Sequence, residues 1–191
     1  MLILHDVSYI HPNRELLFTG INLNINNNEK IALVGNNGVG KSTLLRLLTG
    51  ALKPSAGVAK ADSMPYFVPQ IFGQFNDYTV AQAIGVHDKL HALNEIINGK
   101  ADEENFATLA DDWTIEERCR EAFTHWQLAD IGLTQRMATL SGGQKTKVFL
   151  AGIQIHQPEI VLLDEPSNHL DSAGRGILYD YIQSTNTTLV V

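Results

Sequence analysis

The sequence predicts an α/β fold in which helices cover both faces of a mainly parallel sheet. Apolar runs at 30–34, 160–163 and 187–191 have the length and composition of strands. Stretches with helical character at 41–49 and 171–184 alternate with these runs. Such alternation favours parallel pairing, because each helix carries the chain back to the end of the sheet at which the previous strand began.

An antiparallel β-layer is expected before the first glycine-rich turn. Residues 21–25 alternate Ile or Leu with Asn, which is typical of a strand with one solvated face. The three asparagines at 26–28 predict a turn, since Asn tolerates left-handed backbone conformations. Further short strands are expected at 58–60 and 64–68.

Residues 1–191 are expected to form a single domain with a core of about 1–74 and 138–191. The helical stretch 75–137 interrupts the alternation of strands and helices, and it therefore predicts a separate lobe.

Within this lobe, residues 79–98 have helical composition, whereas the acidic residues 100–112 predict a loop. Thr114 to Glu117 match a capping box and predict the start of another helix. The apolar stripe of that helix is expected to pack in the core rather than bind a ligand; it consists of Ile115, Cys119, Ala122, Phe123 and Trp126.

Composition narrows the classes of function. The formal net charge of −7 argues against a broad surface for nucleic acid, although a local basic patch would be compatible with it. Cys119 is the only cysteine, which suits a reducing compartment. The chain has no apolar run of membrane-spanning length and no signal peptide at its start, so a cytoplasmic location is expected.

The segment Gly35–Ser42 reads G-x-x-x-x-G-K-S, a P-loop placed between an apolar run and a helix. Its glycines let backbone N–H groups point inward, and the following helix presents its positive end to a phosphate. Lys41 is expected to reach the β- and γ-phosphates, and the Ser42 hydroxyl to ligate Mg²⁺. The alternative is a tight turn that binds nothing. The expected nucleotide-binding residues are Asn36, Asn37, Gly38, Val39, Gly40, Lys41, Ser42 and Thr43.

A second candidate segment is the apolar run Ile160–Leu163, which is followed by two carboxylates. A buried parallel strand delivers such residues to the carboxyl edge of the sheet, where ligands bind. Asp164 is expected to hold Mg²⁺ directly or through water, and Glu165 to orient or deprotonate the attacking water. Taken alone, the pair would be read as the solvated end of a strand.

Residues 141–144, Ser-Gly-Gly-Gln, allow two interpretations. Ser-x-x-Gln is a capping box that starts a helix. Two glycines at a helix N-terminus also expose backbone N–H groups to an anion. Because the P-loop already supplies a phosphate site, a second site would serve the nucleotide of another molecule.

These motifs occur in the order found in ABC ATPase domains, which the chain resembles over nearly its whole length. The resemblance rests on Gly35–Ser42, Gln70, Leu140–Gln144, Ile160–Glu165 and Ser167–Asp171. The last run is most similar to the ABC-F subgroup, whose soluble members have tandem ATPase domains. That subgroup normally has Thr at the position of Ser167, and the exchange keeps the hydroxyl.

The resemblance implies that two ATPase domains pair head to tail around ATP. Ser141, Gly143 and Gln144 of one domain would then lie against the nucleotide held by the P-loop of the other. Gln70 would lie near Mg²⁺ and the water, and it counts with Glu165 and Lys41 as a catalytic candidate; Asp171 would couple the two sites. Without the resemblance, Gln70 would be read as an ordinary polar loop residue.

The resemblance also implies an aromatic residue that stacks on adenine, some two dozen positions before the P-loop. His11 is nearest to that spacing, and Tyr9 is the alternative because it offers more ring area. His87 and His91 share a helix face, but a solvated face is the expectation there, since no third metal ligand is evident.

In the ABC family, the strand that matches residues 187–191 leads directly into a histidine at the γ-phosphate. The chain stops before that position, so it is expected to be part of a longer tandem protein. We therefore expect it to bind MgATP but to hydrolyse it slowly or not at all by itself.

Two functions are compatible with these patterns. The first is an ABC-F protein that acts on the ribosome, in translation or in protection from antibiotics. The second is the ATP-binding subunit of a membrane transporter, which would dock a permease. The partners expected in the two cases are a second ATPase domain with either the ribosome or a permease.

Overall fold

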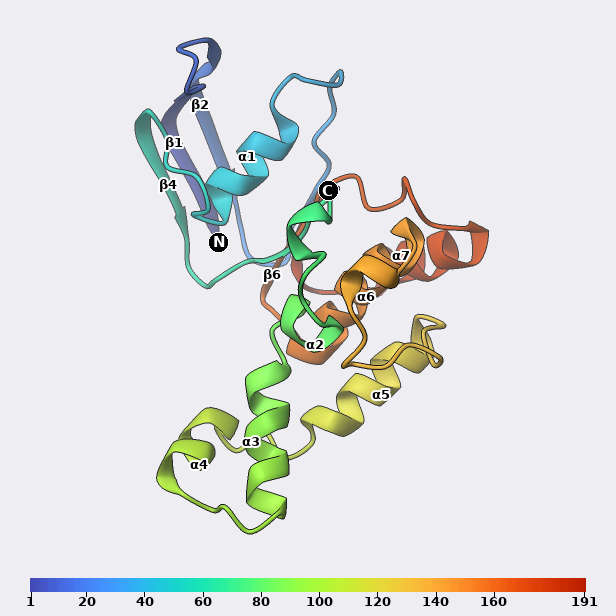
Figure 1. Cartoon of the computed structure of the whole chain (residues 1–191). Helices are drawn as coiled ribbons and strands as arrows, with labels where there is room; N and C mark the ends of the chain where they lie inside the picture. The colour runs from blue at the N-terminus through green and yellow to red at the C-terminus, as the bar shows by residue number, and fades with distance from the viewer. The chain divides into compact units, whose positions relative to one another are not determined.

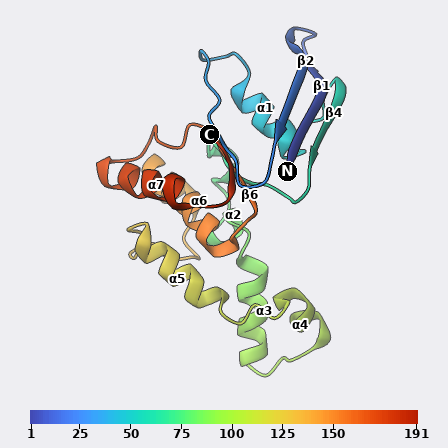
Figure 2. The same ribbon diagram turned by 180° about the vertical axis from the view of Figure 1, so that it is seen from behind.

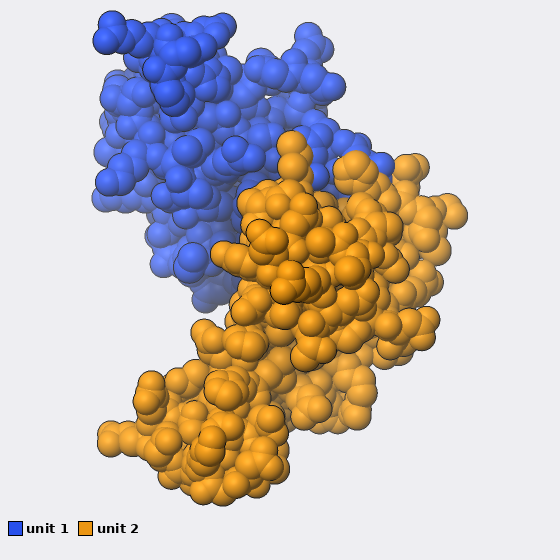
Figure 3. Space-filling model, viewed as in Figure 1, with its two compact units in different colours: residues 1–70, 158–168, 178–191 blue, residues 71–157, 169–177 orange.

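The computed structural model describes residues 1–191, which form two compact units (Figure 3). Unit 1 comprises 1–70, 158–168 and 178–191, and unit 2 comprises 71–157 and 169–177. Each unit is described by itself.

Unit 1 begins with an antiparallel sheet, as the sequence predicted. The strands β1 (Leu2–Ile10), β2 (Leu16–Ile25) and β4 (Ala56–Ala61) lie in the order β2-β1-β4, with Leu2 opposite Ile25 in the first pair (Figure 1). The predicted turn after β2 is present, and Asn28 adopts the expected left-handed conformation with φ of 66°.

The second sheet of unit 1 is parallel, which confirms the predicted α/β class. Its strands are β3 (Lys30–Ile31), β7 (Thr188–Val190), β6 (Ile160–Leu163) and β5 (Tyr66–Val68), in the order β3-β7-β6-β5. Every residue of the central strand β6 is buried. A parallel strand covered on both faces is expected to be apolar throughout, as this one is.

The predicted strand at 30–34 is shorter than expected. Regular pairing covers only Lys30–Ile31, and the Val34 side chain is 93% exposed. This strand is at the edge of the sheet, so it has one neighbour, and the chain leaves the ladder as it turns into the glycine-rich segment. The N–H of Leu33 still donates to the carbonyl oxygen of Val191 at 2.7 Å.

The core of unit 1 lies around helix α1 (Lys41–Leu48), which begins where the glycine-rich segment ends. Its buried leucines pack with side chains from both sheets; this group includes Leu4, Val7, Leu44, Leu45, Leu47, Leu48, Leu162 and Val190. Burial of the apolar face of α1 fixes the position of the turn that precedes it.

Unit 2 is helical (Figures 1 and 2). Its helices are α2 (Val80–Ala83), α3 (His87–Ile97), α4 (Glu103–Leu109), α5 (Ile115–His125), α6 (Gly142–His156) and the first part of α7 (Ser172–Ser184), with short 3₁₀ turns at Gly73–Phe75 and Met137–Thr139. Every residue of the stripe on α5 that was predicted to pack in the core is buried, from Ile115 at the start of the helix to Trp126 just after its end. None of the helices in either unit combines the length and the apolar character that a bilayer crossing requires.

Two predictions for unit 2 were wrong. The segment 100–112 is not a loop throughout, because Asp102 caps α4 by accepting from the N–H of Asn105 at 2.9 Å. Thr114 precedes α5, but its side chain makes no capping hydrogen bond. Instead, the Thr114 hydroxyl accepts from the Arg118 guanidinium at 3.1 Å. The donor to this hydroxyl is therefore a side chain rather than the backbone N–H that a capping box requires.

Candidate active site

The glycine-rich segment of unit 1 is an open turn that side chains would block. Gly38 and Gly40 have φ of 85° and 106°, which is the region that favours glycine. A Cβ atom on Gly40 would lie 3.0 Å from Cδ2 of Leu17. The backbone of the turn can therefore approach a ligand closely, at the N-terminus of α1.

Lys41 is held within this turn by backbone oxygens. Its Nζ donates to the carbonyl oxygen of Gly35 at 2.8 Å and to that of Asn36 at 3.3 Å. The same ammonium lies 3.6 Å from Oε1 of Glu165. The neighbours of this ammonium are thus two carbonyl oxygens and one carboxylate. A bound phosphate would pair with the ammonium more strongly than they do.

Strand β6 delivers Asp164 to the same region. Its carboxylate is buried and accepts from the Ser42 hydroxyl, with Oδ1 2.9 Å from Oγ. Burial raises the pKa of Asp164, and the hydrogen bond from Ser42 opposes that shift. A cation at this carboxylate would remove the cost of burying its charge.

Glu165 is the focus of the polar groups. Its Oε2 accepts from Nε2 of Gln70 at 2.8 Å and from Nδ2 of Asn168 at 2.7 Å. The backbone of Glu165 has φ of 48°, which is unusual for a residue other than glycine. Strain of this kind is found at functional sites, where the surrounding contacts over-determine the conformation.

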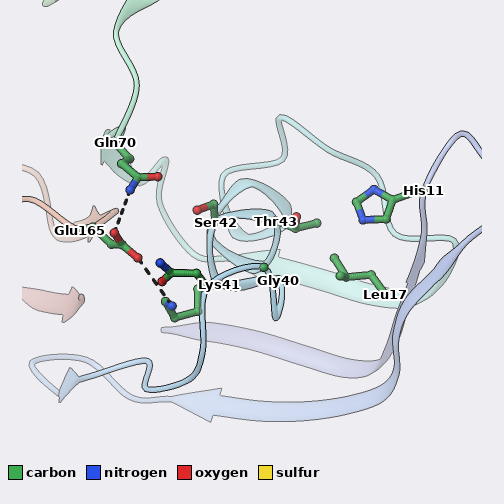
Figure 4. Close-up of a pocket in the computed structure, with 10 residues that line it drawn as sticks. His11, Leu17, Gly40, Lys41, Ser42, Thr43, Gln70 and Glu165 are labelled. Atoms are coloured by element: carbon green, nitrogen blue, oxygen red, sulfur yellow. Dashed lines mark hydrogen bonds and ion pairs between the residues drawn. The ribbon is translucent and has the colours of Figure 1, made fainter.

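Lys41, Ser42, Gln70 and Glu165 line a cavity of about 470 Å³ (Figure 4), whereas Asp164 and Asn168 lie outside its wall. Figure 4 shows His11 and Leu17 at one end of the cavity, with Lys41, Gln70 and Glu165 at the other. The complete wall consists of His11, Leu17, Asn37, Gly38, Gly40, Lys41, Ser42, Thr43, Gln70 and Glu165. An apolar end and a polar end suit a ligand that carries a ring at one end and phosphates at the other.

Of the two aromatic candidates, His11 lines the cavity and Tyr9 does not. Tyr9 packs against the core of unit 1 and contacts Phe18, with ring centroids 6.3 Å apart. The rings of Tyr9 and His11 also meet edge to face, with centroids 5.5 Å apart. Tyr9 therefore packs against His11 without lining the cavity itself.

Other predicted residues of the turn differ in their position. Asn36 and Val39 are outside the cavity wall, although the carbonyl oxygen of Asn36 contacts Lys41. Leu17 is a wall residue that the sequence motifs did not indicate. It belongs to β2 and reaches the cavity only because the antiparallel sheet is placed beside the glycine-rich turn; no local pattern at Leu17 could have revealed this.

Ser42, Gln70 and Asp164 offer a hydroxyl, an amide and a carboxylate, which are the oxygen donors that Mg²⁺ takes in proteins. The hydrogen bond between Ser42 and Asp164 shows that two of these oxygens converge. No group of three or more His, Cys, Asp or Glu side chains in the chain is arranged so that it could hold a metal ion. Accordingly His87 and His91, whose rings are stacked 6.3 Å apart, have no third ligand.

In unit 2, Ser141 forms the predicted capping box at the start of α6. Its hydroxyl accepts from the N–H of Gln144 at 3.3 Å, and the Gln144 side chain accepts from the N–H of Ser141 at 2.9 Å. A Cβ atom on Gly143 would lie 2.7 Å from the carbonyl oxygen of His169, so this position also requires glycine. Ser141 and Gln144 are exposed, so this end of α6 is accessible to another molecule.

Asp171 lies near this segment in unit 2. It caps α7 by accepting from the N–H of Gly174 at 2.7 Å, and this bond, helped by Lys147, holds the pKa of Asp171 below its usual range. Nζ of Lys147 lies 3.3 Å from the Asp171 carboxylate.

A family model and several known proteins match the chain. Residues 18–168 match the family model described as ABC transporter. The chain is 34% identical over 171 residues to ABC transporter F family member 3 of Arabidopsis thaliana, covering 87% of the chain and 21% of that relative. It is 32% identical over 188 residues to the energy-coupling factor transporter ATP-binding protein EcfA of Methanothermobacter thermautotrophicus, covering 90% of the chain and 54% of that relative.

A solved structure shares the fold. It is a dimeric, post-hydrolysis state of the ATP-binding cassette MJ0796 bound to ADP and Pi, with a TM-score of 0.72 and 23% identity, covering 100% of the chain and 87% of that chain. The chain spans between about a fifth and about half of the length of the curated relatives it matches.

Proposed function

The chain belongs to the ABC transporter family, and from that premise we propose that it is an ATPase domain that binds MgATP in the cavity of unit 1 and hydrolyses it. The observation that carries the proposal is the convergence of Lys41, Ser42 and Glu165 on one cavity. Lys41 and Ser42 begin α1, whereas Glu165 follows β6, and each side chain suits a different part of a nucleoside triphosphate.

Each end of the cavity suits a different part of the nucleotide. Adenine stacks on His11 and contacts Leu17, while the phosphates lie over the backbone N–H groups of the turn. Lys41 leaves its carbonyl oxygens to pair with the β- and γ-phosphates. The oxygens of Ser42 and Asp164 hold Mg²⁺, which neutralises charge on the phosphates.

Glu165 directs a water molecule at the γ-phosphate. Its contacts with Gln70 and Asn168 fix the carboxylate. Gln70 would contact the water and Mg²⁺ when both are bound. When Lys41 turns to the phosphates, the carboxylate loses its cationic neighbour. The carboxylate is then free to accept a hydrogen bond from the water that it directs.

A second ATPase domain completes the site. The exposed Ser141 and the half-buried Gly143 of that domain cover the γ-phosphate, as does the exposed Gln144 beside them, and this excludes water. The relative MJ0796, which shares the fold, is described as dimeric with ADP and Pi. Loss of the γ-phosphate weakens the pair, so hydrolysis opens it.

For the complete protein, we propose an ABC-F protein of the cytoplasm that acts on the ribosome. The support is the likeness to ABC transporter F family member 3 and the sequence of the Ser167–Asp171 run. A transporter subunit that docks a permease is the second candidate, and the likeness to EcfA favours it. Both share the same nucleotide chemistry.

Nucleotide binding is tested by titrating the chain with a fluorescent ATP analogue and Mg²⁺. We expect Lys41→Ala to weaken binding by at least tenfold, because the phosphates lose their main cation. Lys53→Ala removes an exposed lysine outside the cavity and is the matched control. Equal affinity of the two variants would refute the assignment of the phosphate site.

Pairing is tested in a Glu165→Gln background, where ATP persists. Light scattering with MgATP should detect a dimer that Ser141→Arg abolishes while ATP binding remains. Ala129→Arg, at another exposed position of unit 2, serves as the control. A dimer unaffected by Ser141→Arg would exclude this segment from the interface.

The cellular partner is tested with the complete protein. Cosedimentation with ribosomes in MgATP, lost as salt rises, supports the ribosome proposal, because contacts with RNA phosphates are screened by salt. Copurification with a membrane permease and no cosedimentation would instead establish the transporter subunit.

A further inference from the structure

The net charge of the chain is concentrated in one segment of unit 2. Residues 95–117 contain eight of the 21 acidic residues and one of the 14 Lys and Arg residues, so their formal charge equals the −7 of the whole chain. The segment includes the end of α3, all of α4 and the start of α5. Figures 1 and 2 both show α4 beside α3, at the end of unit 2 away from α6.

Two exposed aromatic rings lie within this acidic segment. Phe106 of α4 is 43% exposed, and Trp113, in the turn before α5, is 49% exposed. Their rings meet edge to face, with centroids 6.1 Å apart at 63°. In the same unit Trp126 and Phe123 are buried, whereas Tyr78 is also about half exposed.

The backbone around the two rings is firmly held. Leu109, one turn after Phe106, is buried and anchors α4. Asp112, next to Trp113, accepts two hydrogen bonds from Arg118, at 2.7 and 2.9 Å, and one from Lys89 at 2.8 Å. A surface with fixed rings loses little conformational entropy when a partner binds.

Exposed carboxylates without an ion pair lie near the rings in the sequence. Glu103 lies on the same face of α4 as Phe106, three residues away, and Glu104 and Asp111 are also exposed. The remaining acidic groups are in part engaged: Glu95 pairs with Lys100, and Glu117 with Arg120. The free carboxylates add a negative potential to an apolar contact area.

This combination selects the chemistry of the partner. Nucleic acid is disfavoured, because the net charge of the segment would repel its phosphates and the one Lys of the segment is paired with Glu95. A purely apolar partner would strip water from carboxylates without compensation. An arginine side chain satisfies both features, since its guanidinium stacks on an aromatic face and pairs with a carboxylate.

We propose that an arginine-rich segment of a partner protein binds here, on a surface formed by Asp102, Glu103, Glu104, Phe106, Asp111 and Trp113, which we call the acidic aromatic surface. The proposal is independent of the nucleotide site, since all of its residues belong to unit 2. It gives the ATPase domain a contact point for a basic protein rather than for RNA.

The test is fluorescence anisotropy with a labelled nona-arginine peptide at 0.15 M salt. We expect Phe106→Ala with Trp113→Ala to weaken binding at least fivefold, although the net charge is unchanged. Tyr179→Ala removes a similarly exposed aromatic residue elsewhere and should change the affinity less than twofold. Nona-lysine should bind more weakly than nona-arginine, because an ammonium does not stack on the rings.

Charge is tested separately. Glu103→Gln with Glu104→Gln should weaken binding more than Glu121→Gln with Asp130→Asn, a pair of exposed acids outside the surface. Equal effects of the two pairs, or no effect of removing both rings, would overturn the proposal in favour of non-specific attraction. A labelled uridine dodecamer that binds as tightly, and loses affinity in the same variants, would overturn it in favour of RNA.

Folding of the variants is checked by their thermal unfolding midpoints. If the ring-deletion variant does not fold, amide shift mapping of the unaltered chain with nona-arginine replaces it. Shifts confined to residues 102–113 are the expected result, and shifts spread over all acidic surfaces would contradict the proposal.

Discussion

Glu165 in unit 1 and Asp112 in unit 2 are both carboxylates that accept hydrogen bonds from more than one side chain, but their surroundings differ. The Asp112 side chain is 12% exposed, and Lys89 and Arg118 occupy both of its oxygens. The Glu165 side chain is 31% exposed and faces a cavity. Donors around a closed carboxylate stabilise the fold, whereas donors around an open one can be exchanged for a ligand.

The pKa of Asp112 agrees with this difference. Hydrogen bonds from the Arg118 guanidinium, above all, lower the pKa of Asp112 to about 2 from its usual 3.8. Arg118 also donates to the carbonyl oxygen of Ile155 at 3.2 Å, so the cluster joins the start of α5 to the end of α6. The partners of Glu165 are the loop residues Gln70 and Asn168 and, at 3.6 Å, the first residue of α1, Lys41.

The largest predicted effect comes from breaking the open site. Glu165→Gln keeps the shape of the side chain but cannot accept a proton, so hydrolysis should fall by about 10² to 10⁴-fold. ATP affinity and the unfolding midpoint should stay close to those of the parent. Single-turnover hydrolysis at high protein concentration is the measurement, and an unchanged rate would remove Glu165 from the chemistry.

The closed site should show the opposite pattern. Asp112→Asn removes the charge that pairs with Lys89 and Arg118, and we expect the free energy of unfolding to fall by about 2 kcal/mol. Nucleotide affinity should change little, because all of these residues belong to unit 2. Urea unfolding and amide exchange in α3 and α5 measure the effect; weakened ATP binding with unchanged stability would contradict the comparison.

Acid should remove the same contribution in the unaltered chain. The folded-state pKa of Asp112 lies below the unfolded one, so its stabilisation is complete above pH 4 and is lost as the pH falls towards 2. The stability difference between the parent and Asp112→Asn should therefore shrink over that range. Unfolding curves of both proteins at several pH values test this, and a constant difference would assign the stability to packing.

The parts of the molecule that the sequence predicted are those with a local signal. The strand β6 is an uninterrupted apolar run, and the stripe on α5 repeats at helical spacing, so burial follows from the pattern itself. The turn at Gly35–Ser42 needs its glycines for backbone reasons that apply in any context. These predictions did not require knowledge of which residues are neighbours in the folded chain.

The parts that were missed depend on tertiary contacts or on weak local signals. Leu17 reaches the cavity only through the placement of β2, and Thr114 loses its capping role to Arg118. Helix α4 buries one leucine and shows no apolar periodicity, so its acidic residues suggested a loop. A signal was nevertheless present, since Asp102 followed by two glutamates is typical of a helix start.

The smallest predicted effect tests how Glu165 is positioned. Asn168→Ala removes the 2.7 Å hydrogen bond to Oε2 but leaves the one from Gln70. Hydrolysis should therefore fall only several-fold, with ATP affinity unchanged, because the carboxylate keeps one fixed partner. Asn168→Asp should be worse than Asn168→Ala, since a second carboxylate beside Glu165 cannot donate to it and repels it. Identical rates for the two variants would show that Asn168 does not control this carboxylate, and that Gln70 and Lys41 hold it by themselves.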